Sequence, residues 1–441
     1  MIPSRSYLIQ TLLLCCLFLL PSLSYATIPP VQEITSRSGI TAWCIEDHYL
    51  PIVSIKLAFK YSGSAYDPEN QRGLAVMAAS LMDEGAGDMD ALEFKEKLEE
   101  MATTIDFRTD RDYFTVSIKT LSEHVNETLK LLQIALTTPT FDEEAVARVR
   151  GQLVAAIKRQ EKEPNAIASR KLMETMFANH PYSHPPYGTI ESLNNITPDH
   201  LKEYTKTHLT LDRMVIGVAG DITPSDLSKK LSAYLGVLPK SGVGTTVLPE
   251  VVYPTTAQNI SIEYPVPQTV IMFGLPAVLR NDPMFYPTYV TNYIIGGGGF
   301  ESRLMKTVRE ENGLVYSIAS GMDLSDKAGI IAGSAATSSN QAGATLSLLH
   351  DVLEEAKDQG LTETELQNAK QYLMGSFSLK LVTNSNLADF LITMQLDHLG
   401  IDFLAKRNDY IQAITLSQIN HMVKLLINPE RMITVIVGKK T

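Results

Sequence analysis

The chain repeats itself at a fixed interval, and this repeat constrains its fold more than any other feature. The segment Thr197–Gly220 matches Thr415–Gly438 at a constant offset of 218 residues; in each, an acidic residue, Arg and Met precede an apolar strand pattern. A second pair, Phe141–Leu153 and Leu361–Leu373, matches at an offset of 220. Two independent matches at nearly the same offset indicate a tandem duplication of one unit of about 200 residues.

Each unit mixes strand and helix patterns, so the expected fold class is α+β, with two homologous domains that each contain an antiparallel-rich sheet covered by helices. Ile52–Tyr61 alternates apolar and polar residues as a half-buried strand does, whereas Glu143–Lys162 has helical spacing. Further strands are expected at Phe114–Thr120, Met214–Val218, Val270–Leu275, Leu314–Ser320 and Gly329–Thr337. Further helices are expected at Leu74–Met82, Met89–Met101, Val125–Leu136, Pro287–Ile295, Ser302–Glu310, Ala342–Gln359, Glu363–Phe377 and Leu387–His398.

Residues 1–26 have the pattern of a secretory signal peptide. Arg5 precedes the apolar stretch Tyr7–Leu20, and the small residues Ser24 and Ala26 predict cleavage after Ala26. An uncleaved N-terminal anchor is the alternative, although the stretch is shorter than the ~20 residues that a membrane span needs. We therefore expect an exported protein, periplasmic if the host is a Gram-negative bacterium, with no stable membrane span after cleavage.

Composition and charge indicate where the domains are divided and which class of partner is excluded. The Gly-, Ser- and Thr-rich stretch Leu238–Val247 predicts a linker, which divides the chain into an N-terminal domain at 27–240, a linker at 241–250 and a C-terminal domain at 251–441. Signal cleavage would leave Cys44 as the single cysteine, so no internal disulfide is expected. A net charge of −11 argues against nucleic acid as a partner.

Several short motifs recur in a fixed order over the duplicated unit. They are Ser62–Pro68 (SGSAYDP), Arg72–Ala75 (RGLA), His180–Tyr182, Val218–Asp221 (VAGD), and Gly296–Leu304 running on to Arg309 and Tyr316. Their order and spacing resemble the M16 metallopeptidase family (insulinase, pitrilysin, mitochondrial processing peptidase) in its compact two-domain form. The resemblance covers the chain from about Ile34 to Lys440 and implies two domains of the LuxS/MPP-like metallohydrolase type.

The zinc motif of that family is absent. Active members carry His-x-x-Glu-His directly after the Gly-Leu-Ala, because two His four residues apart on one helix face ligate zinc and the Glu activates water. The corresponding positions here are Val76, Ala79 and Ser80, and the family's distal Glu ligand falls near 155–157, where the residues are Ala, Ala and Ile. We expect no metal or other cofactor in this chain, no catalytic residue in cis and no zinc peptidase activity of the chain alone.

No other cluster replaces that motif convincingly. Asp83-Glu84 is interpreted as a solvated helix end before a glycine, and Asp47-His48 as turn chemistry at a hairpin tip. His180 and His184 have ligand-like spacing, but the prolines at 181 and 185 argue against a helix that would place both rings on one face.

A second-half feature of the family is retained. The resemblance implies that Arg309 and Tyr316 reach across a peptide chamber toward a zinc site and contact the substrate. The alternatives are that Arg309 only caps its helix and that Tyr316 is an ordinary strand aromatic. Four consecutive glycines, Gly296, Gly297, Gly298 and Gly299, are either a candidate peptide-contact loop or a tight strand-to-helix crossing.

Three functions remain open at this point. The favoured one is the non-catalytic subunit of a two-chain M16-type zinc metallopeptidase, in which this chain closes the chamber and supplies Arg309 and Tyr316 in trans. The zinc and the His-x-x-Glu-His motif would belong to the partner chain, and the substrate would be a peptide. The alternatives are a peptide-binding or assembly scaffold without proteolytic role, and an independent hydrolase with an unrecognised site.

Overall fold

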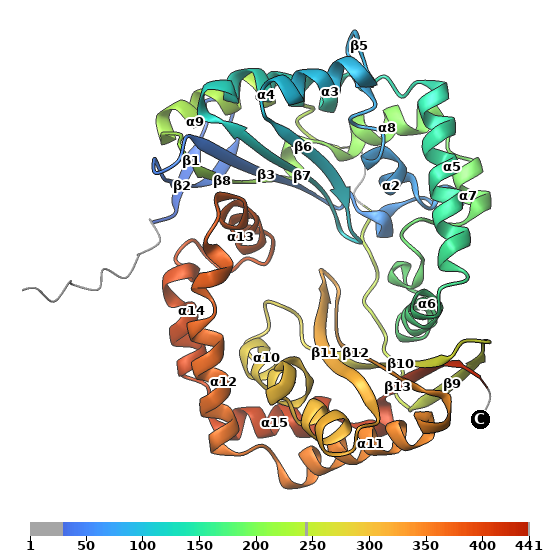
Figure 1. The fold of residues 1–441 in the computed structure, drawn as a ribbon. Helices are drawn as coiled ribbons and strands as arrows, with labels where there is room; N and C mark the ends of the chain where they lie inside the picture. The colour runs from blue at the N-terminus through green and yellow to red at the C-terminus, as the bar shows by residue number, and fades with distance from the viewer. Residues whose placement is uncertain (1–29, 243–245, 440–441) are drawn as a thin grey trace, which may run out of the picture. The chain divides into compact units, whose positions relative to one another are not determined.

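The computed structural model describes residues 30–242 and 246–439, so the predicted signal peptide at 1–26 lies outside the described residues. From Val31 onwards the chain forms one compact unit. It contains two large sheets with helices packed on them, which confirms the expected α+β class (Figure 1). We call β1 to α9 the first repeat and β9 to β13 the second repeat.

The first repeat contains a six-stranded sheet in the order β1-β2-β8-β3-β7-β6. Its strands are β1 (Gln32–Thr35), β2 (Thr41–Glu46), β3 (Ile52–Lys60), β6 (Thr104–Thr109), β7 (Tyr113–Leu121) and β8 (Met214–Gly220). The β2–β8 pair is parallel and the other pairs are antiparallel. A small hairpin, β4 (Gly85–Ala86) and β5 (Met89–Asp90), is separate from this sheet.

The second repeat contains a five-stranded sheet in the order β11-β12-β10-β13-β9. Its strands are β9 (Gln258–Glu263), β10 (Gln268–Ala277), β11 (Val315–Ser325), β12 (Ala328–Ser338) and β13 (Ile433–Gly438). The β9–β13 pair is parallel, as β2–β8 is in the first sheet, and the remaining order also corresponds strand by strand, except that β1 has no counterpart. The duplication in sequence is therefore a duplication of topology, in which the edge strand β11 is the counterpart of the edge strand β6.

Helices surround both sheets, and most of those that the sequence predicts lie close to the expected positions. In the first repeat they are α2 (Leu74–Ala79), α3 (Ala91–Glu100), α4 (Val125–Thr137), α5 (Glu143–Gln160), α6 (Pro164–Met176), α7 (Ile190–Asn194), α8 (Pro198–His208) and α9 (Pro224–Lys230). In the second they are α10 (Phe285–Asn292), α11 (Ala342–Gln359), α12 (Glu363–Gly375), α13 (Asn384–Leu396), α14 (Phe403–Gln412) and α15 (Leu416–Leu426). The helix expected at Ser302–Glu310 is instead a π-helical segment at Met305–Glu311. None of the helices within the described ranges has the length and apolarity needed to cross a membrane.

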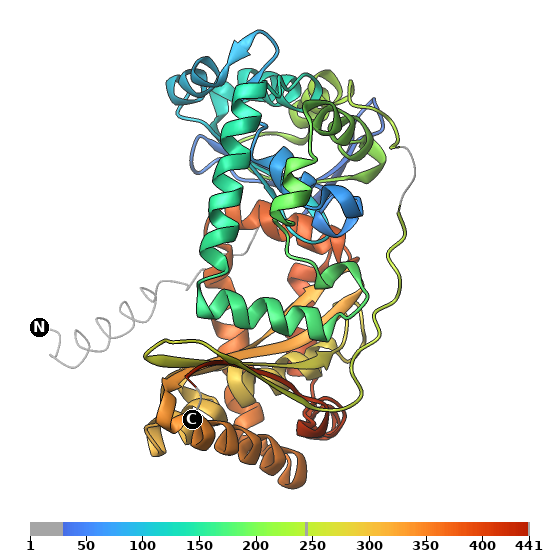
Figure 2. The same cartoon turned by 90° about the vertical axis from the view of Figure 1, so that its right-hand side faces the viewer.

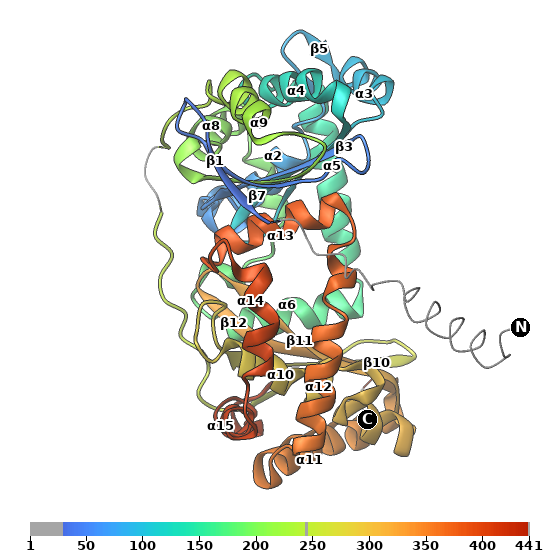
Figure 3. The same ribbon diagram turned by 90° about the vertical axis from the view of Figure 1, so that its left-hand side faces the viewer.

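One helix of each repeat packs on the sheet of the other repeat. Helix α6 packs on β10 and β13 of the second sheet, whereas α13 packs on β8 and β3 of the first (Figures 2 and 3). The two helices begin 220 residues apart, so they are the same element of the duplicated unit. The two repeats are therefore interlocked through an exchange of equivalent helices.

Glycines allow these two helices to approach their sheets closely. A Cβ on Gly217 of β8 would lie 2.5 Å from the Ala388 carbonyl oxygen of α13, which is too close for any side chain. On β10, a Cβ on Gly274 would lie 3.1 Å from a methyl carbon of Leu172 on α6. Close packing of α13 on β8 and of α6 on β10 therefore depends on glycine, which has no side chain, at these two positions.

The chain between β2 and β3 does not form the hairpin expected around Asp47-His48. Strand β8 lies between β2 and β3, so the chain crosses over it. At this crossing, His48 bridges two carboxylates, with its Nε2 2.8 Å from Glu46 and its Nδ1 2.5 Å from Asp221. These hydrogen bonds raise the pKa of His48 above its ordinary value.

Candidate functional site

The start of α2 is firmly positioned, although the zinc residues that follow it in the family are missing. The Asp67 carboxylate accepts hydrogen bonds from the backbone N–H groups of Gly73 (2.8 Å) and Ala75 (3.0 Å) and so caps the helix. Burial raises the pKa of Asp67 to about 8. Gly73 has φ +96° and leaves no room for a Cβ beside the Tyr187 carbonyl oxygen, so only glycine fits this entry to the helix.

Two of the three positions predicted to correspond to the zinc motif, Val76 and Ala79, form part of an apolar wall. Val76 and Ala79 are buried in the same hydrophobic cluster as Leu153 and Ile157 of α5. Ser80 is exposed, and its hydroxyl donates to the Val76 carbonyl oxygen over 2.9 Å. These side chains do not fit a zinc ion, which needs nitrogen, sulfur or carboxylate ligands. Over the described residues, moreover, no three His, Cys, Asp or Glu side chains are grouped so that they could hold a metal ion.

The acidic pair that follows α2 is not the solvated helix end expected from the sequence. The Glu84 side chain is only 12% exposed and forms ion pairs with Arg148 of α5 (2.6 Å) and Lys95 of α3 (3.2 Å). Burial raises the pKa of its neighbour Asp83. Glu84 therefore links the turn that follows α2 to α3 and α5, and it is not available as a general base.

The two histidines with ligand-like spacing are separated by a single 3₁₀ turn, Pro181–Ser183. His180 is buried; its Nδ1 accepts from the Tyr182 backbone N–H over 3.1 Å, and its Nε2 donates to the Pro249 carbonyl oxygen over 3.0 Å. Burial lowers the pKa of both His180 and His184. With both ring nitrogens of His180 engaged, the pair does not form a metal site.

In the second repeat, the structure brings Arg309 and Tyr316 together. The Arg309 guanidinium carbon lies 5.3 Å from the centre of the Tyr316 ring and 4.7 Å from that of Phe300, so the cation is held between two aromatic faces. Tyr316 is 82% exposed and Phe300 is 57% exposed. We call Phe300, Arg309 and Tyr316 the Arg–Tyr corner.

A β-bulge directs Tyr316 outward, and sequence reasoning missed it. Val315 pairs with Thr337 and Ile318 pairs with Ala335, so the two residues between them on β11 face a single residue of β12. Bulges redirect side chains and are common beside functional sites. The sequence does carry a signal for it, because Val315 and Ile318 are both apolar and buried although an alternating strand would place them on opposite faces.

Packing accounts for most of the four-glycine segment. A Cβ on Gly296 would lie 2.3 Å from the Ser320 hydroxyl, and one on Gly298 would lie 2.8 Å from the Tyr293 carbonyl oxygen. Gly299 has φ +59°, in the left-handed region that favours glycine. Direct contact of this segment with a peptide stays a prediction.

Comparison with known proteins places this geometry in a family. Residues 43–190 match the family profile described as Insulinase (Peptidase family M16), and residues 195–373 match that described as Peptidase M16 inactive domain. The chain therefore belongs to the M16 peptidase family, and it is a member in which the residues of the zinc motif are replaced.

Relatives cover nearly the whole chain. The non-peptidase homolog YmxG of Helicobacter pylori is 28% identical over 395 residues, which are 89% of this chain and 90% of the relative. The uncharacterized zinc protease YmxG of Bacillus subtilis is 27% identical over 74% of this chain and 79% of the relative. Among solved structures, a peptidase M16 inactive domain from Pseudomonas fluorescens superimposes with a TM-score of 0.87 at 28% identity, covering 93% of this chain and 98% of that one.

Proposed function

We propose that this chain is the non-catalytic subunit of a two-chain M16 zinc peptidase, and that it supplies Arg309 and Tyr316 to the zinc site of a partner chain that carries His-x-x-Glu-His. The observation that carries the proposal is an asymmetry between the repeats. Two of the three metal positions, Val76 and Ala79, are buried in an apolar core, whereas Arg309 is half-buried and lies against the exposed ring of Tyr316.

The chemistry of the corner suits contact with a second molecule. Tyr316 contributes little to the core because most of its ring meets solvent, and no carboxylate of the described residues pairs with the Arg309 guanidinium. Exposed aromatic side chains beside an arginine are the residue types that dominate binding surfaces. A second exposed aromatic, Tyr372, stacks on Tyr293 beside Gly298 and extends the same kind of surface.

The roles of the two side chains follow from their donors. The planar guanidinium of Arg309 can hold a peptide carbonyl or carboxylate with two parallel hydrogen bonds. The phenol of Tyr316 can donate to the oxygen on which negative charge develops during attack on the peptide bond. The partner's zinc would activate the water, and this chain's residues would bind the substrate, orient it and stabilise the developing charge.

The name of the Helicobacter pylori relative, a non-peptidase homolog, supports a non-catalytic role for this chain. The signal pattern at residues 1–26 supports action after export, in the periplasm if the host is Gram-negative. N-terminal sequencing of the protein from its native compartment tests this placement: Thr27 as the first residue supports export with cleavage, and an intact Met1 contradicts cleavage.

Co-purification from the native host tests the proposal itself. The chain should bring down one M16 chain with an intact His-x-x-Glu-His motif, and the complex should contain about one zinc ion and cleave a quenched peptide. The chain alone should do neither. Zinc and chelator-sensitive cleavage by the isolated chain would contradict the proposal, as would a native complex without a catalytic M16 chain.

A peptide-binding scaffold is the second candidate, and one observation favours it. Strand β6 is an unpaired edge of the first sheet and contacts α2, so an extended peptide could add to it as a further strand. A native complex that retains peptide but contains neither zinc nor cleavage activity would favour this function over the first.

A further inference from the structure

We propose that the turn between β11 and β12 is a pH-responsive docking element, which binds Asp112 and Tyr182 of the first repeat and thereby sets where β11 holds Tyr316. The inference rests on the proposed function for the role of Tyr316. The docking itself is a property of this chain alone and can be tested without a partner.

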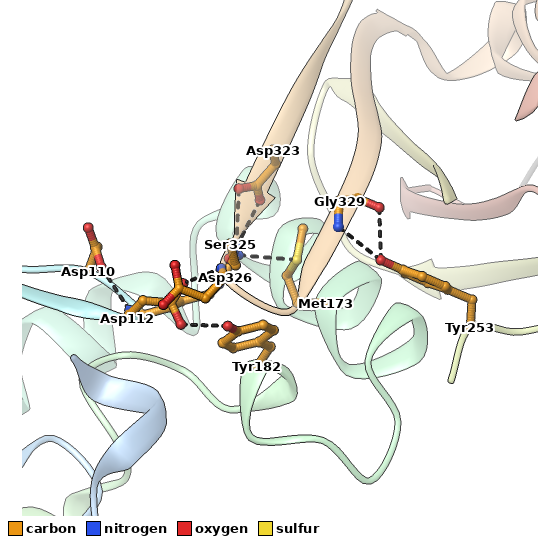
Figure 4. A network of polar contacts seen from close by, with 10 residues as sticks. Asp110, Asp112, Met173, Tyr182, Tyr253, Asp323, Ser325, Asp326 and Gly329 are labelled. Atoms are coloured by element: carbon orange, nitrogen blue, oxygen red, sulfur yellow. Dashed lines mark hydrogen bonds and ion pairs between the residues drawn. The ribbon is translucent and has the colours of Figure 1, made fainter. Parts of the chain in front are cut away.

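The turn residues Asp326 and Lys327 dock through their backbone onto two buried side chains of the first repeat. Figure 4 shows these side chains, Asp112 and Tyr182, beside Asp326. Asp112 accepts the Asp326 N–H on its Oδ2 over 3.0 Å and the Tyr182 hydroxyl on its Oδ1 over 2.5 Å. The Tyr182 hydroxyl in turn accepts the Lys327 N–H over 3.2 Å. One buried carboxylate and one buried phenol therefore hold two consecutive backbone groups of the turn.

Side chains on both sides of the turn reinforce this contact. Arg111 donates two hydrogen bonds to the Asp323 carboxylate, at 3.0 and 3.2 Å, and so holds the end of β11. The Tyr113 hydroxyl donates to the Asp326 carboxylate. One short segment of the first repeat therefore makes these contacts with the hairpin. It comprises the β6–β7 connection, with Arg111 and Asp112, and the first residue of β7, Tyr113.

The docked turn places carboxylates close together. The acidic groups that face Asp112 and the turn are Asp110, Asp326 and Asp397. The basic groups are Arg111, which pairs with the Asp323 carboxylate, and Lys60, Arg280, Lys327 and His398. Phenols of Tyr66, Tyr113 and Tyr182 complete the surroundings. A cavity of about 280 Å³ lies beside the turn and is lined by residues of both repeats, among them Tyr66, Asp326 and Asp397.

Protonation favours the docked state. Burial, together with the charge of Asp326, raises the pKa of Asp112 to about 7. When the turn leaves, Asp112 meets water and its pKa falls toward the ordinary carboxyl value near 4. The docked state therefore binds a proton more tightly than the undocked state. Docking is strongest below the ordinary carboxyl pKa and weakens as the pH rises from there through about 7.

Docking of the turn affects Tyr316 because the turn and Tyr316 lie at opposite ends of β11. Strand β11 runs from Val315 to Ser325, so Tyr316 lies at its first end and the docked turn follows its last. Strand β11 pairs with β12 on both sides of the bulge, at Val315 and from Ile318 to Ser325, so the hairpin is one element. Docking thus fixes the position of Tyr316 relative to the first repeat, and release lets the hairpin move with Tyr316 on it.

Amide hydrogen exchange of the full chain without a partner tests the inference. We expect the Asp326 and Lys327 amides, after correction for intrinsic exchange rates, to be on the order of tenfold better protected at pH 5.5 than at pH 8.5. In Asp112→Asn the protection should persist at both pH values, because the amide keeps an oxygen for the Asp326 N–H and carries no charge. In Asp112→Ala it should be lost at both.

Two further variants keep the result interpretable. Asp358→Asn, at an exposed position on α11, should behave as the wild type. Tyr113→Phe removes only the hydroxyl that binds Asp326, and it should lower protection of the turn while the amides of β3 stay protected. Equal protection of the wild-type turn at both pH values would overturn the inference, as would a pH dependence that Asp112→Asn leaves intact. Because the chain is tested alone, this result is independent of whether a partner peptidase exists.

Discussion

The two repeats share one topology, yet the regions next to their edge strands β6 and β11 differ: one is a closed apolar cluster and the other exposes aromatic side chains beside an arginine. Helix α2, which contacts the edge strand β6, presents Val76 and Ala79 to a closed apolar cluster. The counterpart edge strand β11 begins with a bulge that exposes Tyr316 beside Arg309. The buried apolar side chains of Val76 and Ala79 give the first region a packing role. The exposure of Tyr316 has no such explanation, and this difference is why we place the remaining function in the second repeat.

Rebuilding the zinc motif should produce the largest effect. In the triple variant Val76→His, Ala79→Glu, Ser80→His, an imidazole and a carboxylate enter a buried apolar cluster without partners. We expect a loss of unfolding free energy of roughly 5 kcal/mol. We also expect no tight zinc binding, because residues 155–157 offer no third ligand. Thermal unfolding with and without zinc measures both.

Ser80→His alone is the matched control, because Ser80 is exposed, and it should be nearly neutral. A stable triple variant whose melting temperature rises with one equivalent of zinc would show that the first repeat still holds a metal site. That result would remove the difference between the two regions.

Changes at Arg309 should have the next largest effect, in the reconstituted complex. Arg309→Ala should raise KM by roughly 10–100-fold, because a charge-assisted hydrogen bond to the substrate is lost from both ground and transition states. Arg309→Lys should restore only part of this, since an ammonium lacks the planar two-donor fork. Steady-state kinetics on a quenched peptide measures KM. An unchanged KM in both variants, with the complex intact, would reduce Arg309 to a support for Phe300 and Tyr316.

The exchanged helices predict a smaller effect that concerns stability alone. Gly217→Ala should cost about 1–3 kcal/mol, because the new methyl group meets the α13 backbone at 2.5 Å. Gly321→Ala on β11 is the matched control, since nothing lies within 4 Å of its Cβ position, and it should be close to neutral. Urea unfolding compares the two. Equal stabilities would mean that α13 does not depend on close contact with β8.

The duplicated fold could be predicted well from the sequence because helical and strand periodicity is local. The expected helix Ala342–Gln359 coincides with α11, and the expected strand Ile52–Tyr61 differs from β3 by one residue. Long-range choices could not be predicted this way. The periodicity of Leu387–His398 indicates a helix, but nothing in it says that the helix covers the sheet of the other repeat. Likewise, local turn chemistry at Asp47-His48 does not reveal that β8 inserts between β2 and β3.

In the candidate site, too, local features could be predicted from the sequence and long-range contacts could not. The family resemblance singled out Arg309 and Tyr316, and the structure brings their side chains into contact. The bulge at Tyr316 and the cation–π contact with Phe300 depend on strand register and on a neighbouring loop. The docking of the β11–β12 turn joins residues more than 200 positions apart, such as Asp112 and Asp326. Local sequence patterns therefore could not predict it.

The most direct test of the central claim is the turnover of the two-chain enzyme with Tyr316→Phe in this chain. The variant removes one hydroxyl from an exposed side chain, so folding and assembly should be unchanged. If that hydroxyl stabilises the transition state, kcat should fall by roughly 10²–10³-fold with little change in KM. Wild-type kcat in an intact complex would contradict a role for this chain in the partner's chemistry.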